Sequence, residues 1–198
     1  MIVVLGRPRT VKRGPDGSEG AGGLAARLAL AGARAGAGVE LAGSVGGDAA
    51  GDALAVALTD GGVGHAALLR IPGAATPREG SDDPLPRLEA ADVELALGYL
   101  PECRVLVLAE SLPDETLEVA LDAARFHGAS VVAVLPAGEE PSRRLADAAT
   151  VLAGPAGEAA DGAFADLVGG YAAGLDRGAP AEEAFAAARQ AVGWEPSV

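Results

Sequence analysis

Short apolar runs alternate with amphipathic segments along nearly the whole chain, and this alternation limits the possible folds more than any other feature. The short runs are rich in Val, Leu and Ala and are bounded by polar or Gly-containing turns, which is typical of buried strands. The segments between them carry apolar residues three or four positions apart and end near Gly or Pro, which is typical of helices. Strands that alternate with helices in this way predict a parallel sheet covered by helices on both faces.

The predicted elements extend from the first residues to the last. We expect strands at residues 1–6, 39–43, 63–71, 104–110, 129–136 and 149–154. We expect helices at residues 24–35, 48–60, 88–100, 113–127, 140–148, 159–176 and 180–192. Residues 7–23 leave room for at most one short exposed strand, and the proline-rich residues 72–86 are interpreted as a linker or flap. The predicted fold class is α/β, a three-layer, doubly wound and mostly parallel sheet in a single domain over residues 1–198.

The composition supports such a core and indicates a cellular setting. Hydrophobic residues make up 49% of the chain but aromatic residues only 3%, so Val, Leu and Ala must fill the interior. No uncharged apolar run reaches the roughly 18 residues of a membrane span, and no leader-like segment opens the chain. We therefore expect a soluble, cytoplasmic protein without a membrane partner. The single cysteine, Cys103, excludes an internal disulfide and a Cys-based zinc site, and we expect its thiol to be buried at a strand start.

The charge is unevenly distributed. The formal net charge is −13, yet residues 1–34 hold six basic and two acidic groups. The acidic remainder repels nucleic acid, so we expect no nucleic-acid partner. The basic start, with Arg7, Arg9, Arg13 and Arg27, has two interpretations. It either binds an anionic metabolite through bidentate contacts, or it forms a solvated basic edge that balances the acidic remainder.

Several nucleotide and metal sites are excluded because residues that they need are missing. The only lysine is Lys12, so there is no P-loop, and the glycines of residues 43–51 do not have the spacing of a dinucleotide fingerprint. Two histidines without a second cluster of ligands provide no metal-hydrolase site. We interpret His127 as a structural residue at a helix end and His65 as a structural residue of a strand.

Four blocks of sequence, taken in order, carry a resemblance to a known family. Residues 19–63 contain the pair Gly22–Gly23, a helix, and then "VELAGSVGGDAAG". Residues 103–138 predict a strand, a helix and a strand; residues 145–159 read "LADAATVLAGPAGEA"; and residues 161–193 begin with "DGAFADLVGG". Together the blocks resemble the ribokinase-like (PfkB) family of carbohydrate and nucleoside kinases, and they cover most of the chain.

The resemblance implies a ribokinase-like fold whose lid strands are reduced to residues 7–20 or absent, with a homodimer through such strands left open. It implies a sugar-like alcohol as substrate, with ATP and Mg²⁺ as cofactors. By position, Gly22, Gly23 and Arg27 would contact the substrate, although Arg27 stands where the family usually has an asparagine. Gly162 would help to hold the phosphate, Glu158 would help to hold the metal through water, and Asp166 would be the catalytic base.

The late block also departs from the family pattern. Its register places the base position on Ala165, with Asp166 one residue later and thus about 100° further around the helix. Phe164 replaces the second glycine of the turn, and the strands that shelter adenine in the family are missing. The opening segment lacks the acid that the family presents to sugar hydroxyls. Asp161 either serves as the base or caps the helix.

Two functions therefore stay open at the level of sequence. One is an active, compact kinase that transfers phosphate from ATP to a sugar-like alcohol, with Asp166 or Asp161 as base. The other is a kinase homologue whose activity is lost and which binds a sugar-like or anionic ligand, or acts as a scaffold.

Overall fold

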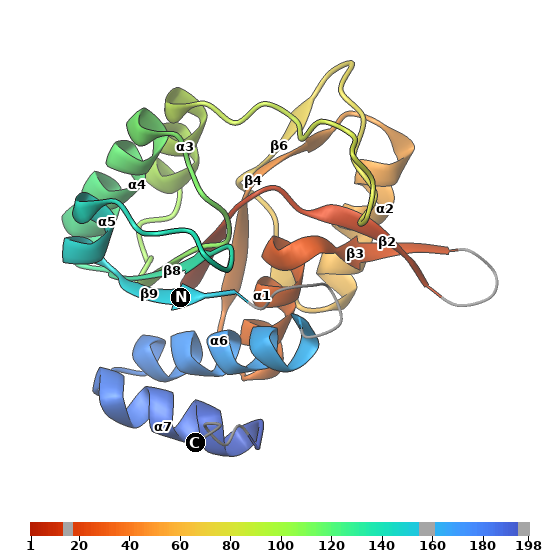
Figure 1. Ribbon diagram of the computed structural model, residues 1–198. Coiled ribbons are helices and arrows are strands. Elements are labelled where there is room, and N and C mark those ends of the chain that lie inside the picture. Colours follow the sequence, from red (N-terminus) through yellow and green to blue (C-terminus); the bar gives the residue numbers. More distant parts are fainter. Residues whose placement is uncertain (14–17, 155–160, 194–198) are drawn as a thin grey trace.

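The computed structural model describes residues 1–13, 18–154 and 161–193, without the side chains of residues 13 and 161 (Figure 1). Its strands are β1 (Ile2–Leu5), β2 (Arg9–Arg13), β3 (Ser18–Gly22), β4 (Val39–Gly46), β5 (Val63–Gly64), β6 (Leu68–Ile71), β7 (Val105–Leu108), β8 (Ser130–Leu135) and β9 (Thr150–Ala153). Its helices are α1 (Gly23–Arg34), α2 (Ala49–Asp60), α3 (Ala90–Gly98), α4 (Asp114–His127), α5 (Arg143–Ala148), α6 (Asp161–Asp176) and α7 (Ala181–Ala191). Within the described ranges, no helix combines the length and the apolar character that a transmembrane span needs.

One sheet of parallel strands runs through the molecule. The strand order is β5-β4-β1-β7-β8-β9, and β6 pairs with the carboxyl-terminal half of β4. β1 is central: Ile2 lies opposite Val39 of β4 on one side and Val105 of β7 on the other. Parallel neighbours require crossover connections, so the helices lie over the faces of the sheet and the carboxyl ends of the strands meet at one edge.

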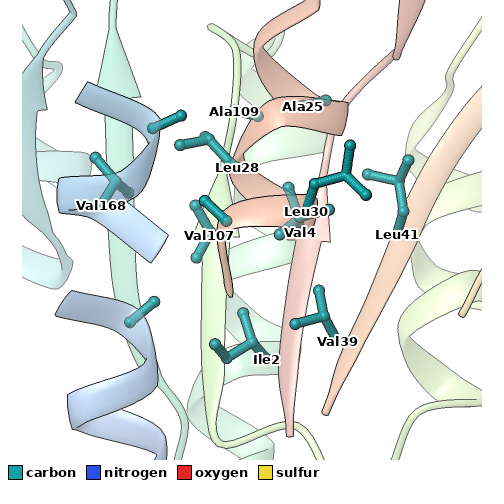
Figure 2. Packing of buried hydrophobic residues seen from close by; sticks show 14 of the residues in the cluster. Ile2, Val4, Ala25, Leu28, Leu30, Val39, Leu41, Val107, Ala109 and Val168 are labelled. Carbon is teal, nitrogen blue, oxygen red and sulfur yellow. The ribbon is translucent and has the colours of Figure 1, made fainter. Parts of the chain in front are cut away.

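Two buried clusters, one on each face, pack the sheet against its helices. On one face, Val4 belongs to a cluster that includes side chains of α1, α2, α6 and α7. Figure 2 shows Leu28 of α1 and Val168 of α6 among the members of this cluster. On the other face, Val3 and Leu106 pack with α3, α4 and α5. Successive side chains of a strand point to opposite faces, which separates the two clusters and produces the three-layer α/β fold predicted from the sequence.

Most predicted strands and helices are confirmed, and residues 63–71 differ in detail. They form two strands, β5 and β6, instead of one. His65 lies in the turn between them, with its Nε2 atom 3.1 Å from the hydroxyl of Thr59. β4 also continues to Gly46, beyond its predicted end at residue 43, because β6 provides a pairing partner for this last part.

Residues 9–13 and 18–22 pair as two antiparallel strands, which we call the hairpin, so the expectation of at most one short exposed strand in this region is wrong. β2 pairs with β3, and the hairpin lies beside α2 (Figure 1). Residues 76–79 give the hairpin a further partner: the Glu79 N–H donates to the Thr10 carbonyl at 2.8 Å, and the Thr10 N–H donates to the Pro77 carbonyl at 3.0 Å. The segment is polar and rich in Gly, so it lacks the alternating apolar pattern of a strand, and its contact with residues 77–79 is too distant in sequence for a local pattern to report. Of residues 7–20, which the resemblance assigns to reduced lid strands, the described ones include β2 and the start of β3.

Cys103 lies just before β7 and is buried, as predicted from the sequence. Burial is the main cause that raises the pKa of its thiol to about 11. Since the thiolate is the reactive form, roughly one thiol in a thousand is reactive at pH 8 in the folded protein. We expect iodoacetamide to label Cys103 far more slowly in buffer than in urea, as measured by mass spectrometry over time. Equal rates in the two conditions would contradict this prediction.

Candidate functional site

The carboxyl edge of a parallel sheet is where ligands bind in such folds, and α1 begins there. Gly22 is the N-cap of α1, none of the described side chains caps this helix start, and its first turn carries no acid. Gly23 has a φ of 71°, which glycine adopts readily, and a Cβ on Gly22 would lie 2.8 Å from the Cβ of Val11. The glycine pair therefore lets β2 pass close to the helix start and leaves that start open to an incoming ligand.

A cleft of about 340 Å³ lies over the start of α1. Its lining residues are Arg9, Gly23, Leu24, Arg27, Glu79, Gly80, Ser81 and Asp82. Three segments contribute to it: β2, the first turns of α1, and part of the connection from β6 to α3. Two of the predicted substrate-binding residues, Gly23 and Arg27, thus line one cleft, and Gly22 adjoins it.

Asp48 fixes the segment that closes this cleft, which we call the strap (residues 76–82). Its Oδ1 accepts hydrogen bonds from the Gly51 N–H (2.9 Å) and the Thr76 hydroxyl (2.7 Å), and its Oδ2 accepts one from the Thr76 N–H (2.9 Å). The Thr76 hydroxyl in turn accepts from the Gly46 N–H at 3.0 Å. Burial would raise the pKa of Asp48, but the hydrogen bonds from Thr76 and Gly51 outweigh it and hold this pKa below its usual value. The "GSVGGDAAG" motif therefore has a local role: it anchors the strap beside α2.

Acidic and carbonyl partners engage the arginines around the cleft. Arg27 pairs with Glu79, and Arg78 pairs with Glu19. The hydrogen bond from Arg78 is the main cause that lowers the pKa of Glu19. Nη1 of Arg9 donates to the carbonyl oxygens of Arg78 at 3.3 Å and Ser81 at 3.2 Å. The basic start of the chain is therefore built into the structure of the cleft and the strap.

A second cleft, of about 410 Å³, lies at the carboxyl ends of β7 and β8 and shares Leu24 with the first. Glu110 and Glu139 line it, and the Ser111 hydroxyl donates to Glu139 at 2.6 Å. Arg7 holds Glu110 through a forked contact, in which Nε and Nη2 donate to Oε1 and Oε2 at 3.0 and 2.8 Å. The described residues that line this cleft include no lysine or arginine.

Asp166 lies away from both clefts. Its carboxylate pairs with Arg34 at 2.5 Å, and Arg34 is the last residue of α1, at the end opposite the first cleft. Phe164 and Ala165, the latter being the residue that the sequence register aligns with the family's base, are buried in the core. Gly162 is exposed in the first turn of α6, and a Cβ there would meet no atom of the described residues within 4 Å.

The structure thus gathers only part of the predicted site. Gly22, Gly23 and Arg27 come together, whereas Asp166 faces Arg34. Glu158 and the side chain of Asp161 lie outside the described residues. Sequence reasoning missed Glu79, which lines the cleft and pairs with Arg27. The reading of residues 72–86 as a flap pointed to the correct region, but no motif distinguished Glu79 from its neighbours.

The parallel sheet, its crossover helices and the small hairpin over its carboxyl edge define the ribokinase-like α/β fold, which is the fold of PfkB carbohydrate kinases. Among solved structures, the chain is similar to Arabidopsis thaliana ribokinase complexed with ribose and ATP, with 17% identity and a TM-score of 0.68 over 96% of this chain and 90% of that one. It is also similar to a PfkB protein from Polaromonas sp. JS666, with 15% identity and a TM-score of 0.63 over 97% and 96% of the two chains. No family model matches the chain, and no curated protein matches it. At these identities the likeness establishes the fold and confirms the resemblance at that level.

The described residues of the second cleft offer carboxylates, which are oxygen ligands that suit Mg²⁺, but no cationic side chain for the phosphate groups of ATP. Proteins hold phosphate groups with cationic side chains and with amide groups at helix starts. This cleft instead presents the carboxylates of Glu110 and Glu139. In the described part of the chain, no group of three His, Cys, Asp or Glu side chains is arranged to hold a metal ion.

Proposed function

We propose that this protein binds a small sugar-like or anionic ligand in the cleft at the start of α1 and is a non-catalytic homologue of the carbohydrate kinases whose fold it has. The observation that carries this proposal is the ion pair of Asp166 with Arg34, at the far end of α1 from the cleft. Binding residues and the candidate base are thus separated within one chain.

Phosphoryl transfer needs the base and the phosphate-binding groups to address the same atoms. A general base must lie within hydrogen-bonding reach of the hydroxyl that it deprotonates. Misplacement by even about 1 Å can cost two orders of magnitude in rate. Asp166 is engaged by Arg34, and the position one residue earlier holds the buried Ala165, which has no titratable group. Ligand binding makes no such demand, because the cleft needs only its own lining.

The substitution Asp166→Asn tests this separation. We expect it to leave ligand binding unchanged and to alter the free energy of unfolding by no more than about 0.5 kcal/mol, because the lost ion pair is about half exposed. Thermal shifts with a panel of sugars and sugar phosphates measure binding, and urea unfolding measures stability. Arg27→Ala, inside the cleft, should weaken the shift. Loss of binding in Asp166→Asn with full binding in Arg27→Ala would overturn the proposed site.

An ATP-dependent sugar kinase is the second candidate function. The observation that favours it is the adjacency of the two clefts at Leu24, since a phosphate donor site must adjoin the acceptor site. Such a kinase would use Mg²⁺ and would need Asp166 to leave Arg34, or Asp161 to act as base. Release of ADP from ATP and Mg²⁺ decides between the two functions. Sugar-dependent release that is lost in Asp166→Asn would establish the kinase, whereas a lack of saturable ATP binding would eliminate it.

A further inference from the structure

We propose that Glu79 and Arg27 recognise neighbouring hydroxyl groups of the ligand, with Glu79 as acceptor and Arg27 as donor, so that the cleft selects an uncharged polyol over a sugar phosphate. This inference rests on the ligand binding proposed above and specifies the chemical class of the ligand. An ionised carboxylate only accepts hydrogen bonds and a guanidinium only donates them, so the pair together matches a diol, each of whose hydroxyls can do both.

The carboxylate of Glu79 has one oxygen that is engaged and one that has no partner in the described part of the chain. Oε1 pairs with Arg27, whereas Oε2 is buried and has no hydrogen-bond partner among the described residues. A Cβ on Gly22 would lie 3.0 Å from this Oε2, so the glycine leaves room beside it. A buried acceptor without a partner lowers stability, because it has lost its water and gained no hydrogen bond in exchange. Rotation of the carboxylate turns one oxygen toward a ligand hydroxyl and keeps Arg27 on the other oxygen. The hydrogen bond from that hydroxyl then gives the unpartnered acceptor a donor.

The strap holds Glu79 in place before any ligand arrives. The Glu79 N–H donates to the Thr10 carbonyl at 2.8 Å, and the strap is anchored at its start by the hydrogen bonds from Thr76 to Asp48. The Glu79 side chain is only 11% exposed. Binding therefore spends little free energy on ordering this side chain.

The charges of the cleft favour an uncharged ligand. Arg9 and Arg27 are balanced by Glu79 and Asp82 among the residues that line it. A phosphate group that binds Arg27 would lie beside the carboxylate of Glu79. Both groups are negatively charged, and neighbouring like charges repel strongly in a partly buried site. The arginines at the start of the sequence, which alone would indicate an anion site, thus serve an uncharged ligand once Glu79 is included.

Matched titrations of sugars and their phosphate esters test the proposal. The probes are D-ribose, D-fructose and ribitol, with ribose 5-phosphate and fructose 6-phosphate as charged counterparts, each titrated calorimetrically. We expect a neutral probe to bind more tightly than its phosphate ester, and Glu79→Gln to weaken that binding roughly 10- to 100-fold, the range for loss of a hydrogen bond to a charged group. Glu118→Gln is the control. Glu118 of α4 is an exposed ion-pair partner of Arg144 of α5, with its Oε1 2.9 Å from Nη1 of Arg144, and its replacement should leave the affinity for the sugar unchanged.

Each outcome bears on one proposal or on both. Equal affinity of wild type and Glu79→Gln for a neutral sugar, or tighter binding of the phosphate ester, would overturn this inference while the cleft stays the binding site. A wild-type protein that binds none of the probes would overturn the proposed function together with the inference. If Glu79→Gln does not fold, Arg27→Lys decides, because it keeps the charge but loses the planar fork: unchanged affinity for the neutral sugar would again overturn the inference.

Discussion

Gly43→Ala should lower the free energy of unfolding by about 4 kcal/mol, a large share of the roughly 5–15 kcal/mol that is usual for a domain. Gly43 lies in β4 where the backbone of the neighbouring β1 segment comes closest: a Cβ there would be 2.0 Å from the carbonyl oxygen of Gly6. Its φ of 153° adds to the strain of any side chain. The obstacle is main chain in the centre of the sheet, which cannot move aside without breaking the register of β1 and β4.

Urea unfolding followed by circular dichroism measures this loss. Gly38→Ala is the matched control, because a Cβ at Gly38 would meet no atom within 4 Å, and we expect its stability to stay within about 0.5 kcal/mol of wild type. A Gly43→Ala protein that unfolds within about 1 kcal/mol of wild type would show that β1 and β4 are not as close at this point as the structure has them.

Asp48→Asn should cost about 2–3 kcal/mol and should also weaken ligand binding at the cleft. The aspartate accepts three hydrogen bonds, from the Gly51 N–H, the Thr76 N–H and the Thr76 hydroxyl. An asparagine keeps one acceptor oxygen and turns an NH₂ group toward donors, so the α2 cap or the strap loses its anchor. Because the strap carries Glu79, a loosened strap raises the cost of ordering the cleft.

The pH dependence of stability distinguishes loss of the Asp48 carboxylate from loss of packing. The pKa of Asp48 is lowered in the folded protein, so its contribution is complete above the ordinary carboxyl pKa of about 4 and is lost as the pH falls through the lower folded value. Wild type should therefore lose more stability on acidification below about pH 4 than Asp48→Asn does. The exposed Asp60→Asn at the end of α2 is the control and should follow wild type. Parallel acid profiles for wild type and Asp48→Asn would contradict the assigned role.

The sheet and its layers could be predicted from the sequence because they rest on local patterns. The β-branched runs around Val4 and Val107 are buried on both faces of the sheet, and the helical spacing of Leu54 and Leu58 places both side chains in the core. The late helix could be predicted in the same way from its apolar spacing, and the structure has α6 over Asp161–Asp176 with Leu167 and Val168 buried. Each of these statements depends on residues within about one turn or one strand of each other.

The contact between β2 and the strap could not be predicted, because the two segments lie far apart along the chain. Thr10 pairs with residues 77–79, a polar segment without periodicity. The same is true of the functional side chains: 132 residues separate Arg34 from Asp166, and no local pattern links Arg27 to Glu79. The course of a loop depends on which surfaces come into contact once the sheet has formed. Loop segments therefore show no hydrophobic periodicity in the sequence.

The amino-acid sequence by itself determined the alternation of strands and helices, the glycine pair at the start of α1, and the absence of a carboxylate at position 165. Only the tertiary structure decided which acids meet which arginines: Glu79 with Arg27 at the cleft, and Asp166 with Arg34 away from it. The physical reason is that burial and backbone geometry follow from neighbours in sequence. Charge pairing follows from neighbours in space, and those exist only once the chain has folded.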